Sequence, residues 1–459
     1  MPKNIVIAIL LLFTTTISIA QKERTFTEEQ LREDLKFLKE GFETYGPNLG
    51  VFHPKEDFIA VYDSLSNSLQ GSMTDLEFFP YVARLAAANK EGHTILGASP
   101  DTITSIFRGF TENKFDYFPI LLVKPQDKTR VWANLSSDST LQPGDQLLKI
   151  NGKTIESILQ HLEQYAITDG DIPNAKTQKV LASFSRYYYW FYERPEHYEI
   201  AYQPYQSNKV KKTTVPAAPL DSLIAWRDRR YGKPEVTERT IDDVYEFKIE
   251  EGIGILTLKS FNRGLKDRFK INTKKLYKSI FKELEEKSVQ NLIIDLRDNN
   301  GGREEYTKDI LPYLLKEPID GIAIKSTSWE GKQSTHKLPK PSKWAFQGKI
   351  YVLTNVNSFS NGSVIPALAK EYANATIVGG ETSSRYEGFA AGSQQYITLP
   401  NTKLSVRIPR YLREYPHPNH PQKLKNRGVL PHYPVTYSFA DLQEKRDKTM
   451  EKAMELIKQ

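Results

Sequence analysis

The chain has 459 residues, of which 39% are hydrophobic and 11% aromatic, values typical of a soluble globular protein with two to four domains. Its net charge of +7 comes from 63 basic and 56 acidic residues that are interspersed, a pattern that argues against a nucleic-acid partner. The absence of cysteine excludes a disulfide framework and a lipid-modified cysteine.

Residues 1–20 have the pattern of a secretory signal peptide. Lys3 is followed by an apolar run from Ile5 to Phe13, and Ser18-Ile19-Ala20 offers small residues for cleavage before Gln21. The alternative, a membrane anchor, is less favoured because the run is short and rich in threonine. We therefore expect an exported protein, periplasmic or extracellular, with no membrane span after signal removal.

Residues 21–110 are predicted to form a helical N-terminal domain. Thr27-Glu28-Glu29-Gln30 is a capping box, and the apolar residues from Leu31 to Phe42 recur on one helical face. A second capping box, Thr74 to Glu77, opens another helix that ends near Glu91-Gly92-His93-Thr94.

Residues 115–215 are predicted to be rich in β-structure, with an insertion. Phe118 to Val123 resembles a strand, and Leu141 to Lys153 reads as a turn, a strand and a second tight turn. The aromatic run from Tyr187 to Tyr192 favours packing between domains, with a hydrophobic-ligand site as the alternative. Residues 216–243 are predicted to be a linker.

Residues 244–459 are predicted to form an α/β domain. In two places an apolar strand runs into a Gly/Asn/Ser-rich turn and then a helix: Leu292–Gly302 and Ile350–Ser363. Repeated alternation of this kind predicts a mostly parallel sheet with crossover helices.

Ser360 is the candidate nucleophile, because it lies where the second strand gives way to a helix. Unpaired N–H groups at a helix N-terminus favour a developing oxyanion. A plain N-cap serine is the competing explanation, and Ser358 and Ser363 compete for the role. The turn that contains Gly301 and Gly302 can supply further backbone donors.

His93 is the candidate base, since a serine nucleophile needs one and imidazole titrates near neutrality. A structural histidine is the alternative, and seven other histidines exist. The segment from His417 to Pro421 contains a second histidine, His420, but its prolines prevent a helix that would align the two rings. We expect no metal.

Four motifs resemble the C-terminal processing, or tail-specific, serine protease family, and particularly its tricorn-like branch. They occur in the family's order: Asp295–Gly302, the Ser360 turn, Gly379-Gly380-Glu381-Thr382 and Gly428-Val429-Leu430-Pro431. The resemblance implies an α/β (α+β multidomain) protein. It would have a crotonase/ClpP-like catalytic core, a helical N-terminal region and a PDZ-like unit.

The resemblance also implies roles for individual residues. The family's nucleophile falls on Ser360, and its oxyanion donors fall on the N–H of Asn361 and of Gly301 or Gly302. One branch uses a lysine base, but that position here is Arg385, which stays protonated. The tricorn-like branch uses a histidine from the N-terminal region, which falls on His93.

Two departures leave the third catalytic member open. Lys425 stands where the tricorn-like branch has an assisting glutamate, and His432 replaces an aspartate. Glu414 and Glu381 are the candidates. The PDZ-like unit also lacks a glycine-rich carboxylate-binding loop, which weakens the expectation that it captures substrate C-termini.

The predicted function is therefore an exported serine endopeptidase that cleaves polypeptides through an acyl-enzyme on Ser360, with His93 as general base. No cofactor is expected, and the oligomeric state is left open. The first alternative is a non-catalytic protein that binds hydrophobic ligands or peptides on the same fold. The second is a scaffold that recruits partners through its PDZ-like unit.

Overall fold

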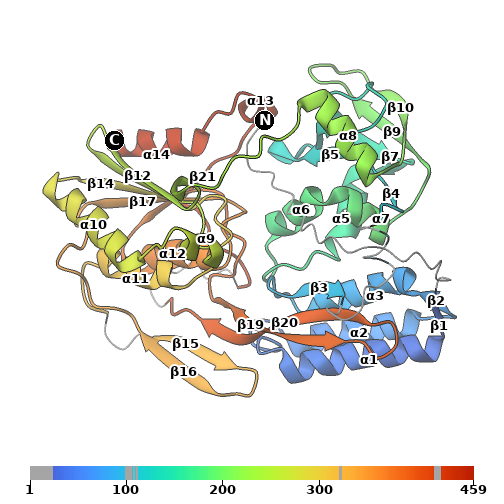
Figure 1. The fold of residues 1–459 in the computed structure, drawn as a ribbon, viewed down its shortest axis with the longest axis horizontal. Helices are drawn as coiled ribbons and strands as arrows, with labels where there is room; N and C mark the ends of the chain where they lie inside the picture. Colours follow the sequence, from blue (N-terminus) through green and yellow to red (C-terminus); the bar gives the residue numbers. More distant parts are fainter. Residues whose placement is uncertain (1–23, 99–105, 107–108, 110–111, 320–322, 418–424) are drawn as a thin grey trace.

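A computed structural model describes residues 24–98, 106, 109, 112–319, 323–417 and 425–459 (Figure 1). The predicted signal peptide, residues 1–20, lies outside them. In the described part of the chain, no helix has both the length and the apolar character needed to cross a membrane.

The N-terminal region is a group of three helices, as the sequence predicts. Capping boxes at Thr27 and Thr74 start two of them, so both capping predictions are confirmed. Two short strands pair beside the helices. The elements are α1 (Glu28–Tyr45), α2 (Lys55–Ser68), α3 (Asp75–Ala88), β1 (Thr25–Phe26) and β2 (Met73–Thr74).

The second region is an antiparallel sheet, in the order β10-β9-β7-β6-β5, with helices packed on it. Its core is continuous with that of α1 and α3. The strands are β4 (Asp116–Tyr117), β5 (Ile120–Val123), β6 (Arg130–Asn134), β7 (Gln146–Ile150), β8 (Lys153–Thr154), β9 (His197–Gln203), β10 (Lys211–Pro216) and β11 (Ala218–Pro219). The helices are η1 (Pro125–Asp127), α5 (Ile155–Glu163), α6 (Pro173–Ala182), α7 (Phe184–Phe191) and α8 (Leu220–Tyr231).

The aromatic run is helix α7, which packs against α3. Phe79 of α3 stacks on Phe191 with ring centroids 5.6 Å apart and meets Trp190 edge-on at 5.5 Å. This contact is the interdomain packing that we favoured over a ligand site. Helix α8 lies inside the stretch expected to be a linker, and residues 233–240, which follow it, are exposed and without helix or strand.

The third region contains a six-stranded sheet in the order β12-β13-β14-β17-β18-β21. It is parallel from β13 to β21, as predicted, and β12 is an antiparallel edge strand. The strands are β12 (Tyr245–Glu250), β13 (Ile253–Leu258), β14 (Asn291–Asp295), β17 (Lys349–Thr354), β18 (Thr376–Gly379) and β21 (Tyr433–Pro434). The helices are η2 (Ile241–Asp243), α9 (Arg263–Arg268), α10 (Thr273–Glu286), α11 (Glu305–Leu314), α12 (Asn361–Tyr372), α13 (Phe439–Gln443) and α14 (Lys448–Lys458).

Both faces of this sheet are covered because successive side chains of each strand point to opposite faces. Leu292 and Ile294 face the core built with α10, α11 and α12, whereas Ile293 faces α14. The turns after β14 and β17 therefore emerge side by side at the carboxyl edge, which sets the place of the site.

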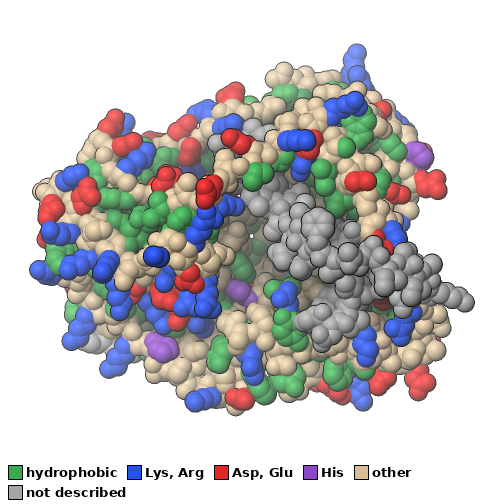
Figure 2. All heavy atoms as spheres, viewed as in Figure 1, with side chains coloured by type: hydrophobic (Ala, Val, Ile, Leu, Met, Phe, Trp, Pro, Cys, Tyr) green, Lys and Arg blue, Asp and Glu red, His purple; other side chains and the backbone are tan. Residues whose placement is uncertain are grey.

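Strands β19 and β20 form a long antiparallel ribbon that joins the third region to the N-terminal helices (Figure 1). Its strand β20 pairs with β3, which begins two residues after His93. Figure 2 shows that the surface is hollowed between the third region and the rest of the molecule, above this ribbon. The strands of this second sheet are β3 (Ile95–Ala98), β15 (Ala323–Ser328), β16 (Gln333–Lys337), β19 (Gly388–Thr398) and β20 (Leu404–Glu414).

Candidate active site

Ser360 occupies a strained turn between β17 and α12. Its φ of 53° and ψ of −129° are angles that residues other than glycine rarely adopt. The turn is held by the Ser360 N–H, which donates to Ser384 Oγ over 2.8 Å, and by the Phe359 N–H, which donates to the Asn299 carbonyl over 3.0 Å. Strain of this kind clusters at functional sites, where it presents a side chain that an ordinary helix start would turn away.

Ser358 and Ser363, the two serines that competed with Ser360, have hydroxyl groups that are hydrogen-bonded to the backbone. The Ser358 hydroxyl donates to the Leu296 carbonyl over 2.8 Å and accepts from the Asn355 N–H over 3.0 Å. The Ser363 hydroxyl donates to the Ser358 carbonyl over 2.6 Å, and both side chains are buried. Neither hydroxyl is available to attack a substrate.

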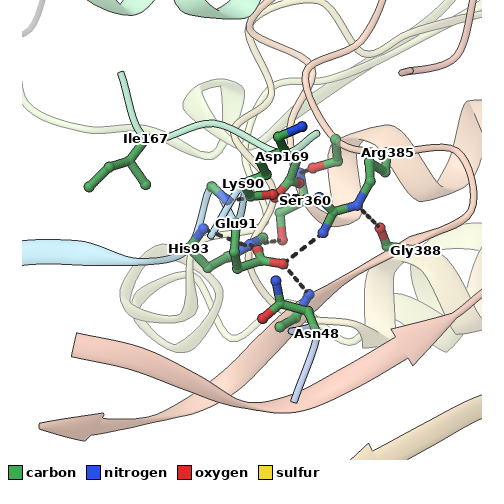
Figure 3. A network of polar contacts seen from close by, with 12 residues as sticks. Asn48, Lys90, Glu91, His93, Ile167, Asp169, Ser360, Arg385 and Gly388 are labelled. Atoms are coloured by element: carbon green, nitrogen blue, oxygen red, sulfur yellow. Dashed lines mark hydrogen bonds and ion pairs between the residues drawn. The ribbon is translucent and has the colours of Figure 1, made fainter. Parts of the chain in front are cut away.

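His93 lies beside Ser360, although the two residues are 267 positions apart in the chain. Nε2 of His93 is 3.0 Å from Ser360 Oγ (Figure 3). The imidazole is stacked between Phe359 and Phe389, with centroid distances of 4.6 and 5.2 Å. These rings fix the plane of the imidazole, so the hydroxyl and the base are aligned for proton transfer.

Glu91 is the carboxylate at the other nitrogen of His93. Its Oε1 is 3.1 Å from His93 Nδ1, and its Oε2 accepts from Arg385 Nη2 over 3.0 Å and from the Ala390 N–H over 2.8 Å. Burial alone would raise the pKa of Glu91, but the hydrogen bond with His93 and the charge of Arg385 outweigh burial and lower it. An ionised Glu91 can hold the proton at Nδ1 and leave Nε2 free to accept one.

The two glutamates considered for the third position lie elsewhere. Glu414 is the last residue of β20, opposite Gly388 and Lys325. Glu381 accepts from the Arg427 guanidinium and from a backbone N–H, which is a structural role. Glu91 was overlooked although it lies two residues before His93, because the sequence alone does not show which carboxylate reaches the ring.

Arg385 stands at the position of the lysine base in one branch of the family. It connects the third region to residues 90–94, the loop between α3 and β3 that carries His93 (the histidine loop). Its guanidinium donates to the carbonyls of Lys90 and Gly388 and is ion-paired with Glu91, and both charged side chains are 0% exposed. It also lies 4.4 Å from the centroid of the Phe52 ring. A buried, permanently charged partner keeps Glu91 ionised.

The expected oxyanion donors lie around Ser360. A Cβ built on Gly301 would come within 2.7 Å of Ser360 Cβ and 2.8 Å of Asn361 N, so only glycine fits. The Gly301 N–H, however, donates to Asn299 Oδ1 over 2.8 Å. Asn361 is the first residue of α12, so its N–H has no acceptor within the helix. This leaves Asn361 and Gly302 as the better-placed donors.

Glu91, His93 and Asp169 offer possible metal-ligand atoms within 4.8 Å of one another. Both nitrogens of His93 already have partners, and the Arg385 guanidinium occupies the cation position at Glu91. The arrangement therefore suits proton transfer better than metal binding. Asp169 is a further residue of the site that the sequence did not reveal.

The remaining sequence candidates lie outside this centre. His432 belongs to the sheet, since its Nδ1 accepts from the Ile377 N–H over 2.9 Å. Lys425 is exposed. His417 Nδ1 is 2.9 Å from a backbone carbonyl, and His420 lies outside the described residues.

A cavity of about 150 Å³ opens next to Asn361. Buried Leu311 and Val364 contribute apolar surface, and the ion pair between Arg413 and Glu304 adds charge. Because Asn361, which follows Ser360 in the chain, lines this cavity, its size and position suit a side chain of a bound ligand.

Comparison with known proteins gives one family match, over the region that contains Ser360. Residues 252–435 match the family model described as Peptidase family S41. A comparison with curated proteins finds no match.

Among solved structures, mature CPAF complexed with lactacystin is similar with a TM-score of 0.62 and 15% identity, over 94% of this chain and 98% of that one. Mature CPAF alone gives a TM-score of 0.60 at 15% identity, over 91% and 94% of the two chains. The photosystem II D1 C-terminal processing protease gives 0.41 at 12% identity, over 88% and 93%. At these identities the CPAF structures show a shared fold.

The matched segment spans the Gly301 turn, Ser360 and Arg385, and the mixed α/β fold around it is shared with CPAF. The match of residues 252–435 to peptidase family S41 thus supports a tail-specific serine peptidase.

Proposed function

We propose that the protein is an exported serine endopeptidase in which Ser360 and His93 cleave polypeptides through an acyl-enzyme. The observation that carries the proposal is the 3.0 Å contact between Ser360 Oγ and His93 Nε2, which joins two distant parts of the chain at one strained turn. Polypeptide substrates follow from the peptidase family.

The proposed reaction begins when His93 Nε2 takes the proton of Ser360 as Oγ attacks the substrate carbonyl carbon. Glu91 stabilises the imidazolium through Nδ1–H. The N–H groups of Asn361 and Gly302 would bind the oxyanion. His93 then gives the proton to the leaving amine, and water attacks the ester with His93 as base.

The surroundings of the site support finer expectations. The cavity beside Asn361 would receive one substrate side chain, whose burial would orient the carbonyl. The histidine supplied from the N-terminal region supports a tricorn-like arrangement. The parallel sheet with its ribbon supports a crotonase/ClpP-like core, and the sheet of β5–β10 supports a PDZ-like unit.

The test compares hydrolysis of an unfolded protein by the chain from Gln21 with hydrolysis by Ser360→Ala and His93→Ala. We expect each variant to lose about 10⁴-fold or more in kcat. Exposed Ser279→Ala and His197→Ala are the matched controls and should retain the parent rate. Full hydrolysis by Ser360→Ala would overturn the assignment.

A fluorophosphonate probe separates a peptidase from a binding protein on the same fold. Labelling confined to Ser360 supports an activated nucleophile. A folded parent that is neither labelled nor able to cleave would favour the binding protein. Export is tested separately, because a secreted product that begins at Gln21 would establish the signal peptide.

A further inference from the structure

Asp169 is a fully buried aspartate that reaches the active site from a different region of the chain. It lies between α5 and α6, in a segment that packs against the histidine loop (Figure 3). Asp169 Oδ1 accepts from the Gly92 N–H over 2.6 Å, and the Gly170 N–H donates to the Lys90 carbonyl over 3.0 Å. A Cβ built on Gly92 would come within 3.0 Å of Asp169, so the two loops are in close contact.

The same segment is also fixed to the catalytic region. The Asp171 N–H donates to the Asn426 carbonyl over 3.0 Å, and a Cβ built on Gly170 would lie 2.4 Å from that oxygen. Asp169 is therefore held in place from both sides, and its position does not depend on its own side-chain bonds.

The second oxygen of Asp169 has an unusual environment. Oδ2 is buried, and no described residue donates a hydrogen bond to it. The Asp169 side chain lies beside the Glu91 carboxylate: one oxygen of each carboxylate and one nitrogen of His93 lie within 4.8 Å of one another. An ionised carboxylate with an orphaned oxygen beside another carboxylate is costly in a buried site.

The charges that face Asp169 cannot neutralise two carboxylates. The Arg385 guanidinium is already paired with Glu91, and His93 is uncharged while it acts as base. Lys179, on α6, directs its ammonium to the Ile167 carbonyl over 2.7 Å, and burial lowers its pKa. A proton on Oδ2 resolves the conflict, because it removes one charge and turns the orphaned acceptor into a donor.

We propose that Asp169 keeps a proton and donates it in a hydrogen bond to Glu91, so that it acts as a positioning residue for the Glu91–His93 pair. The inference rests on the proposed function of Ser360 and His93. Burial and the negative charge of Glu91 raise the pKa of Asp169, in agreement with the geometry. The segment between α5 and α6 is thereby part of the catalytic centre.

Asp169→Asn is the decisive variant, because an amide keeps a donor toward Glu91 and an acceptor for the Gly92 N–H without being able to ionise. We expect its kcat/KM to lie within about threefold of the parent near pH 6. Toward about pH 9 the parent should lose rate as Asp169 ionises, whereas Asp169→Asn should hold its plateau. Asp169→Ala should lose about tenfold or more in kcat with little change in KM.

Asp171→Asn is the matched control, with the same change two residues away at a side chain that pairs with Lys90 and Lys176 outside the carboxyl pair. It should reproduce the parent profile at every pH. A loss of activity in Asp169→Asn near pH 6, or an unchanged alkaline decline, would overturn the proposal. Either result is distinct from failure of the proposed function, which requires that Ser360→Ala remain active.

Stability measurements test the same proton without relying on activity. Because the folded pKa of Asp169 is raised, the folded chain keeps a proton that the unfolded chain releases above about pH 4. The free energy of unfolding should therefore fall as pH rises from there toward the folded pKa. Asp169→Asn should lack this fall, and an equal fall in parent and variant would contradict the proposal.

Discussion

At Glu91, burial and the surrounding hydrogen-bond donors have opposite effects on the charge of one side chain. Burial disfavours the ionised form, whereas Arg385, the Ala390 N–H and His93 favour it and win, so the pKa of Glu91 is lowered. The carboxylate therefore remains charged across the neutral range, where it can orient His93 and stabilise the imidazolium that forms during proton transfer.

Glu91→Gln should lower kcat by about 10³–10⁴ with little change in KM, because the amide can hold the wrong tautomer of His93. Steady-state kinetics on a peptide substrate would measure the loss, and the rate of fluorophosphonate labelling should fall in parallel. Exposed Glu196→Gln is the matched control. A Glu91→Gln enzyme within about threefold of the parent would show that Glu91 does not orient the base.

His53 provides a pH prediction that is independent of catalysis. Burial, followed by the charges of Lys90 and Arg385, lowers the pKa of His53 to about 4, and neither ring nitrogen has a partner among the described residues. The unfolded chain therefore binds a proton near pH 6.5 that the folded chain accepts only near pH 4. Stability contributed by neutral His53 is complete above this window and is lost as pH falls through it.

His53→Gln should remove that part of the acid sensitivity. We expect the difference in melting temperature between about pH 7 and about pH 4 to be smaller in the variant than in the parent. Exposed His197→Gln, which loses an imidazole without a burial penalty, is the control and should match the parent. An unchanged acid response in His53→Gln would show that His53 is already protonated when folded.

Single residues differ in how far sequence could identify them. Ser360 and His93 were named through the resemblance to the tail-specific proteases, whereas the local pattern alone left Ser358, Ser363 and seven other histidines open. Glu91 and Asp169 were missed because their roles depend on which chain segments meet. Asp169 comes from the segment between α5 and α6, and no local pattern predicts that this segment contacts the loop before β3.

At the scale of elements, the ribbon of β19 and β20 connects the helices to the site. Asp34 of α1 is 0% exposed and binds the turn at the ribbon's end: its Oδ2 accepts from the Thr402 N–H and hydroxyl over 2.8 and 2.6 Å. Its Oδ1 accepts from the Asn401 N–H over 2.8 Å. These bonds fix α1 to the ribbon, and β3 extends the same sheet toward His93.

Asp34→Ala should destabilise the fold by about 2–4 kcal/mol, because two buried donors of Thr402 and two part-buried donors of Asn401 would lose this acceptor. Chemical denaturation would measure the change. The matched control is Glu33→Ala, one position earlier on α1, whose carboxylate bonds an Asn401 side chain at the surface. A cost below about 1 kcal/mol for Asp34→Ala would mean that water replaces the carboxylate.

Elements that have a clear pattern in their own sequence were predicted well. Elements that depend on pairing with distant parts of the chain were not. The strands before the Gly301 and Ser360 turns were found because buried parallel strands are continuous apolar runs. The β19–β20 ribbon was not anticipated, since its two strands are stabilised by pairing across the chain with β3 and β15. The aromatic run at α7 was predicted to pack against another part of the protein, and it does so against α3. Its helical form was not predicted.

At the scale of the whole molecule, the site combines residues from all three regions of the fold. One exposed segment of the chain lies between the first two regions and the third. Residues 233–240 are exposed, and Val236 is 97% exposed. Before this segment lie His93, Glu91 and Asp169, and after it lies Ser360. Because the halves share buried contacts rather than only a covalent link, the site should not depend on the continuity of the chain.

Cleavage within 233–240, at an inserted site for a sequence-specific protease, should leave the two fragments associated and active. The contacts that cross the cut include β3 paired with β20, Asp34 bonded to Thr402, the ion pair of Glu91 with Arg385, and Phe439, whose ring lies 6.2 Å from that of Trp132. We expect co-elution on gel filtration and at least about half of the parent rate after cleavage.

The control places the same insertion at the exposed residues 70–72, between α2 and β2, where a cut leaves His93, Glu91, Asp169 and Ser360 on one fragment. Fragments that dissociate with loss of activity only after cleavage at 233–240 would show that the covalent link supplies the association. Fragments that remain together but lose activity would instead show that the crossing contacts hold the halves without fixing His93 against Ser360. Retained activity in the nicked protein would mean that the noncovalent contacts between the two fragments are sufficient to position the base.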